Sequence, residues 1–242
     1  MKFTALVAAI LGMVTLPHAH AVVLIGWDPQ GMSAANGGWP DGWSSSSQGG
    51  TVTVDSGIQI VEGLNRGAGT TAGTLNNGWG ATGINQTTQA AAISDNDYLF
   101  FSLAPQEGNL MSLSALDYNV RLVSTPWNSG DTRYLWQYKV GDGSFVDIGE
   151  PLALVGEYNT NGVAQPTLNL SGIAALQNVT EEVEFRMYAW NSGGQFVFGR
   201  LPGNDLALSG SVSAVPEPSR MLFLILGVMS WMFRRYRTPI PG

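Results

Sequence analysis

Residues 116–122 read LDYNVRL, and this stretch decides the fold class. Every second side chain is apolar and those between are polar, which is the pattern of a strand with one buried face and one solvated face. Residues 182–189, EVEFRMYA, repeat the alternation. Between two further strand candidates, 134–140 and 145–148, the run GDGS at 141–144 is typical of a hairpin turn. The sequence therefore predicts antiparallel β-structure.

Shorter apolar segments extend this pattern along the chain. Strands are predicted at 22–27, 51–54, 58–62, 98–104, 195–199 and 205–212, with one helical turn at 172–177. Strands and helices do not alternate, so a parallel sheet is not expected. About ten strands separated by turn signals indicate an all-β fold, namely an antiparallel β-sandwich of jelly-roll-like topology.

The composition favours one domain between two terminal segments. The 242 residues include 31 glycines and only 12% charged residues, a mixture that suits short strands and turns. We assign 22–214 to the domain, whose first third is rich in Gly, Ser and Thr. Between Val22 and Val215 there are six basic and 17 acidic residues, a net charge of −11. This charge argues against nucleic acid as a partner, because the phosphates would be repelled.

Residues 1–21, MKFTALVAAILGMVTLPHAHA, have the three parts of a secretory signal peptide in order. Lys2 is the positive start, an apolar run follows to residue 16, and Ala19 and Ala21 are the small residues that signal peptidase needs. We expect cleavage after Ala21. The alternative interpretation is a short buried helix of the domain.

Cleavage there would remove both histidines of the chain, and the sequence has no cysteine. The mature protein would then lack the residues for a Ser-His-Asp triad, a Cys-His pair or a His-ligated zinc site. Only carboxylates, lysine, tyrosine and hydroxyl groups would be left for catalysis. We therefore assign no catalytic residue.

Residues 215–237, VPEPSRMLFLILGVMSWMFRRYR, predict a C-terminal membrane anchor. As a helix, the 13 apolar residues Met221–Phe233 are about 20 Å long, shorter than the ~30 Å hydrocarbon core. We expect a transmembrane helix at 220–233 and a basic tail at 234–242, in which Arg234, Arg235 and Arg237 stop transfer. A buried helix of the domain is the alternative.

The combination of Val215, Pro216, Glu217, Pro218 and Ser219 with a short apolar helix and a terminal arginine cluster resembles the PEP-CTERM sorting signal. The resemblance implies recognition by a membrane-embedded exosortase, in the inner membrane of a Gram-negative-type bacterium. It also implies delivery to the cell surface or the exopolysaccharide matrix. Arg220 departs from the small residue usual after the serine. This resemblance covers about the last 25 residues. A looser one, from Tyr98 to Val212, is to the bodies of many PEP-CTERM proteins, and it implies a jelly-roll body of unknown role.

Tryptophans in loops suggest a place for sugars. Exposed indole rings can form a platform on which sugar rings stack, and four tryptophans lie among glycines or serines: Trp39, Trp43, Trp79 and Trp127. Trp136 and Trp190 lie on predicted strands, and we expect them to be core anchors. The alternative for the loop tryptophans is also burial.

Two acidic residues suggest calcium. Asp28 follows the first strand and Asp205 begins the last, so they meet if those strands are neighbours. Ca²⁺ prefers oxygen ligands, but no consecutive calcium-binding loop is present, and solvated loop acids are the alternative. No other cofactor is expected.

These observations predict an exported, non-enzymatic protein with a structural or adhesive role at the surface or in the matrix. The alternatives are a carbohydrate-binding module that attaches to exopolysaccharide and a weak polysaccharide hydrolase. A hydrolase would need two carboxylates across a cleft.

Overall fold

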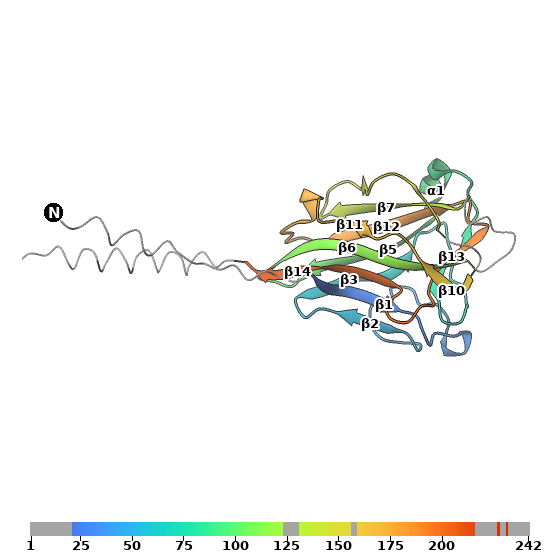
Figure 1. Cartoon of the computed structure of the whole chain (residues 1–242), viewed down its shortest axis with the longest axis horizontal. Helices are drawn as coiled ribbons and strands as arrows, with labels where there is room; N and C mark the ends of the chain where they lie inside the picture. Colours follow the sequence, from blue (N-terminus) through green and yellow to red (C-terminus); the bar gives the residue numbers. More distant parts are fainter. Residues whose placement is uncertain (1–20, 123–130, 156–158, 216–226, 228–230, 232–242) are drawn as a thin grey trace, which may run out of the picture.

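The computed structural model describes residues 21–122, 131–155 and 159–215, together with Gly227 and Trp231. The described residues form two antiparallel sheets that pack face to face (Figure 1). The predictions of an all-β class and of antiparallel pairing are confirmed. The signal segment up to residue 20 and the segment 216–242, apart from Gly227 and Trp231, lie outside this part of the chain.

The first sheet has the strand order β2-β1-β14-β6-β13-β4, and β10 and β11 also pair with β6. Its strands are β1 (Val22–Asp28), β2 (Thr51–Val54), β4 (Trp79–Ile84), β6 (Asn109–Leu122), β10 (Asn159–Ala164), β11 (Leu168–Asn169), β13 (Gly194–Phe198) and β14 (Leu206–Ala214). The long strand β6 is the centre of this sheet, and the chain's first described strand lies beside its last.

The second sheet has the order β3-β5-β12-β7-β8. Strand β9 also pairs with β7, at Arg133 and Tyr134, whereas β8 pairs at Gln137 and Tyr138. Its strands are β3 (Ile58–Arg66), β5 (Tyr98–Pro105), β7 (Arg133–Val140), β8 (Val146–Asp147), β9 (Leu152–Ala153) and β12 (Val183–Trp190). Three short helical segments complete the described elements: η1 (Ala34–Asn36), α1 (Gln89–Asp95) and η2 (Ala174–Leu176).

Aromatic side chains from both sheets fill the space between them. The ring centroids of Trp27 and Phe101 lie 4.9 Å apart, and those of Tyr118 and Trp136 lie 5.5 Å apart. The Tyr118 hydroxyl donates to that of Tyr134 at 2.9 Å, so this buried pair of polar groups is satisfied. These contacts make one continuous core.

The alternating stretches behave as predicted. The apolar side chains of 116, 118 and 120 are buried while Asp117 is exposed, although the strand is longer than predicted and begins at Asn109. The turn at 141–144 joins β7 to β8, and its Gly143 N–H donates to the Val140 carbonyl.

The sequence did not predict strands β4, β9, β10 and β11 or the helical segments η1 and α1, and β4 and α1 show why. Strand β4 contains Gly80 and Gly83, and because glycine is uncommon in strands, the sequence of β4 does not indicate one. Helix α1 has only seven residues; the Thr88 hydroxyl accepts from the Ala91 N–H at its start, and Asn96 ends it in the left-handed conformation. Neither element has a long periodic pattern.

Helix α1 covers one end of the outer face of the second sheet. There Ala92 packs with Leu135 and Trp190 in a small buried cluster separate from the main core. Trp136 and Trp190 are both buried, at 2% and 6% exposure, so their prediction as core anchors is confirmed. They belong to different clusters on the two faces of this sheet.

Both ends of the described body lie at one end of the molecule, which we call the terminal pole (Figure 1). Val22 pairs with Gly210, and the Val215 N–H donates to the carbonyl of Gly108 in the turn between β5 and β6. The opposite end, the far pole, holds the end of β1 at Asp28 and the end of β3 at Arg66, because Arg66 pairs with Leu99 at the start of β5.

Among the described residues, no helix has both the length and the apolar character that crossing a bilayer requires. The helix predicted at 220–233 falls almost wholly outside them.

Candidate functional site

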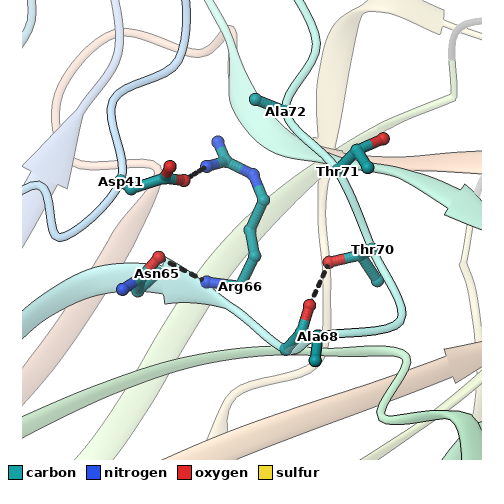
Figure 2. Close-up of a pocket in the computed structure, with 8 residues that line it drawn as sticks. Asp41, Asn65, Arg66, Ala68, Thr70, Thr71 and Ala72 are labelled. Atoms are coloured by element: carbon teal, nitrogen blue, oxygen red, sulfur yellow. Dashed lines mark hydrogen bonds and ion pairs between the residues drawn. The ribbon is translucent and has the colours of Figure 1, made fainter.

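A pocket of about 440 Å³ opens at the far pole (Figure 2). The last residues of β3 and the following loop, 65–72, form most of its wall, and Asp41 comes from the loop before β2. The Gly-rich loop turns back on itself, since the Thr70 hydroxyl donates to the Gly67 carbonyl at 3.0 Å. Most of the residues that line the pocket are polar, namely Asp41, Asn65, Arg66, Thr70 and Thr71.

Arg66 is the central side chain of this pocket. Its side chain is only 4% exposed, whereas that of Asp41, its ion-pair partner, is 76% exposed. Nη1 of Arg66 meets Oδ1 of Asp41 at 2.5 Å, and Nε donates to the Gly80 carbonyl at 2.6 Å. Nη2 is buried and has no hydrogen-bond partner among the described residues. Figure 2 shows the guanidinium group turned toward Asp41.

Two tryptophans hold the guanidinium group in position. Its central carbon lies 4.3 Å from the centroid of the Trp79 ring and 5.9 Å from that of Trp39. Burial lowers the pKa of Arg66, and the Asp41 carboxylate opposes this. The ordinary arginine pKa is so high that the group stays charged.

The sugar-platform prediction is wrong for Trp39, Trp43 and Trp79. These rings are 4%, 2% and 0% exposed, so they present no face to a sugar. Each indole N–H donates to a backbone carbonyl, that of Leu75, Ser45 or Pro40 respectively. The loops fold over the rings because their glycines allow it: a Cβ on Gly73 would lie 2.6 Å from the Trp39 ring, and one on Gly50 would lie 2.5 Å from the Trp43 ring. Trp127 lies outside the described residues.

The pocket combines a fixed cationic donor with an exposed carboxylate acceptor. A ligand rich in hydroxyl groups can donate to the exposed Asp41 carboxylate, which the buried Arg66 holds in position. Asp41 is the one carboxylate among the described residues that line this pocket. The described lining of this pocket thus does not contain the pair of carboxylates that glycoside hydrolysis uses.

Sequence reasoning missed Arg66. Its partners come from two separate segments, the loop at Asp41 and the start of β4 at Trp79 and Gly80, so no local motif identifies it. The available signal was its position four residues after the predicted strand 58–62 and directly before a Gly-rich loop, in a body with only six basic residues.

The structure brings Asp28 and Asp205 to neighbouring positions. Trp27 pairs with Leu206 in antiparallel strands, so Asp28, directly after Trp27, lies beside Asp205, directly before Leu206. Asp205 is fully buried and Asp28 is half-buried. Burial raises the pKa of Asp205 to about 7, although hydrogen bonds from Leu201 and Asn119 oppose the rise. The described residues contain no group of three or more acidic or histidine side chains suited to a metal ion.

The predicted sorting residues lie almost wholly outside the described part of the chain. Pro216, Glu217, Pro218 and Ser219, the arginines 234, 235 and 237, and Ala19 all fall there. Val215 is described, and it adds one backbone hydrogen bond to the end of β14. Ala21 is exposed immediately before β1.

Comparison with known proteins gives no family. No family model and no curated protein matches the chain. A family two carbohydrate esterase from Cellvibrio japonicus is among the solved structures found, with 13% identity, 68% of this chain covered and a TM-score of 0.21. This chain spans 33% of that structure's length. A similarity of this size carries no argument about function.

Proposed function

We propose that this chain is an exported protein of the cell surface or extracellular matrix, sorted by an exosortase-type system and without enzymatic activity. The supporting observation is where the folded strands begin and end. Strand β1 begins at Val22, directly after the predicted signal cleavage, and β14 ends at Ala214, two residues before the Pro-Glu-Pro motif. The proposed processing sites therefore flank the sheets and leave them intact.

The proposed route uses signal peptidase at residues 19–21 and an exosortase at 215–219, with the helix 220–233 held in the inner membrane during sorting. As part of the same proposal, we assign the two packed sheets to a jelly-roll-type sandwich. The neighbouring positions of β1 and β14 agree with that topology.

The polarity of the molecule suits attachment at one end. Both strand ends lie at the terminal pole, and the Arg66 pocket lies at the far pole, roughly 25 Å away by the strand rise. A protein held through its C-terminus would thus direct the pocket away from the anchor. This arrangement supports an adhesive role over a purely space-filling one.

A sorting experiment tests the proposal. The wild-type chain and a variant with Pro216→Ala, Glu217→Ala and Pro218→Ala are expressed in a Gram-negative host that carries an exosortase. We expect the wild type in the surface and matrix fractions and the variant in the inner-membrane fraction. Pro166→Ala, a change at an exposed proline within the body, is the control and should sort normally. Equal surface delivery of the triple variant would refute the proposed motif.

A second candidate function is carbohydrate binding at the Arg66 pocket. The observation that favours it is the exposed carboxylate of Asp41, which the buried guanidinium group of Arg66 holds in position at the pocket. Exopolysaccharide from the same host is the ligand to measure, by calorimetry. Asp41→Ala should weaken binding about tenfold, which is the loss of roughly one charge-assisted hydrogen bond.

The control for this candidate is Asp142→Ala, a change at an exposed acid in the β7–β8 turn. Equal binding by the Asp41 and Asp142 variants would exclude the pocket as the binding site. Release of reducing sugar from the same polysaccharide, abolished by a single carboxylate change, would favour the weak-hydrolase alternative instead.

A further inference from the structure

Three neighbouring strands bring polar side chains together on the outer face of the first sheet at the far pole. Trp27, Leu206 and Tyr118 pair across β1, β14 and β6 and are buried in the core. Because side chains alternate along a strand, the adjacent Asp28, Asp205 and Asn119 project from the opposite face in a row. The backbone of Asp205 is fixed on both sides: its N–H donates to the Trp27 carbonyl, and its own carbonyl accepts from the Asn119 N–H, each at 2.8 Å.

The Asp205 carboxyl group is buried with half of its acceptors unused. Its Oδ1 accepts from Asn119 Nδ2 at 3.1 Å and from the Leu201 N–H at 3.0 Å. Its Oδ2 is buried and has no hydrogen-bond partner among the described residues. A buried carboxylate oxygen without a partner is costly, so a proton or a cation must stabilise it.

The charges around Asp205 favour a cation. In addition to burial, the negative charge of Asp28 raises the pKa of Asp205, and the positive charge of Arg121 lowers this pKa by less. Arg121 directs Nη1 to the Asn76 carbonyl at 2.7 Å. Asp28 uses Oδ1 to accept from the Gln30 N–H at 2.9 Å.

We propose that Asp28 and Asp205 bind a calcium ion that joins the first strand of the body to the last. The ligands are anionic oxygens, which a hard divalent cation prefers, and backbone carbonyls and water complete its coordination. With two carboxylates, the affinity belongs to the weak, submillimolar class found in extracellular modules. This inference is independent of the proposed sorting and of the Arg66 pocket.

Metal analysis of the purified full chain tests the site directly. After equilibrium dialysis against about 1 mM CaCl₂, a concentration in the range of extracellular sites, we expect one bound Ca²⁺ per chain. Asp28→Asn and Asp205→Asn should each lower the amount of Ca²⁺ bound per chain at least tenfold. Asp142→Asn, a change in the exposed β7–β8 turn, should leave it unchanged. Absence of bound calcium from the wild type, or equal binding by all four chains, would overturn the proposal.

Thermal unfolding separates a cation from a proton. In wild type, we expect millimolar Ca²⁺ to raise Tm by about 5 °C relative to EGTA at pH 8, and both Asp→Asn variants to lose this shift. If a proton occupies Oδ2 instead, acidification to about pH 5.5 will raise Tm equally in EGTA and in Ca²⁺, because the group's pKa lies between those pH values. That second result would also overturn the calcium site.

Discussion

At the scale of single residues, Arg66 shows how a buried charge is made tolerable. Its stem and guanidinium group lie against Trp39 and Trp79, while the Gly80 carbonyl and the Asp41 carboxylate accept its hydrogen bonds. Since Asp41 is exposed, its part of the ion pair is weakened by solvent. Most of the contribution of Arg66 to stability should therefore come from packing and from the bond to Gly80.

We expect Arg66→Ala to lower the free energy of unfolding by about 3 kcal/mol, because it removes a buried side chain and leaves the Gly80 carbonyl unpaired. Asp41→Ala should cost only about 1 kcal/mol. Urea denaturation of both variants measures the difference. A loss for Asp41→Ala as large as that for Arg66→Ala would contradict the assignment of stability to packing.

A second residue-scale prediction concerns pH. The folded-state pKa of Asp205 is about 7 and its ordinary value is 3.8, so the folded state binds this proton more tightly than the unfolded state. Without calcium, the stability that this proton provides is complete below about pH 4 and is lost as the pH rises through 7. Asp205→Asn should remove that component.

The measurement is the difference in urea midpoint between wild type and Asp205→Asn, followed from pH 4 to pH 8 in EGTA. Because both proteins share every other titrating group, the difference isolates Asp205. The wild type should lose stability relative to the variant as the pH rises. A difference that is constant with pH would show that Asp205 titrates normally.

At the scale of elements, the strands that the sequence predicted best are those whose side chains alternate between apolar and polar. Strands β6 and β12 alternate in polarity, and the sequence identified both, as it identified β1 and β14 at the ends of the body. Strand β4 was missed because its glycines carry no polarity signal. The composition of the loops around Trp39, Trp43 and Trp79 could not reveal burial, since the carbonyls that bind their indole groups and the segments that cover them are set by tertiary structure.

The same reasoning explains what could be foreseen of the sites. Asp28 and Asp205 were expected to meet if the first and last strands were neighbours, and the pairing of β1 with β14 fulfils that condition. Arg66 was not foreseen, because the segments that hold it meet only in the folded chain.

Gly80 provides an element-scale prediction. A Cβ there would lie 2.0 Å from the Phe196 carbonyl oxygen, so Gly80→Ala must separate β4 from β13. We expect a loss of about 3 kcal/mol in the free energy of unfolding. Gly172→Ala is the matched control, because a Cβ at Gly172 meets nothing within 4 Å, and it should change stability by less than about 0.5 kcal/mol. Equal effects of the two changes would refute the close approach of β4 and β13.

At the scale of the whole molecule, the proposed function depends on the relation between the sheets and the two terminal segments. The strands occupy Val22 to Ala214, and both ends lie at the terminal pole. Among the described residues, the main core is built from side chains between Leu24 and Leu208. Removal of both segments should leave the body folded.

Intact-mass analysis of the protein recovered from the surface of an exosortase-bearing host tests this relation most directly. We expect a chain that begins at Val22 and lacks residues 220–242. A recovered mass that still includes residues 1–21 or 220–242 would contradict this expectation.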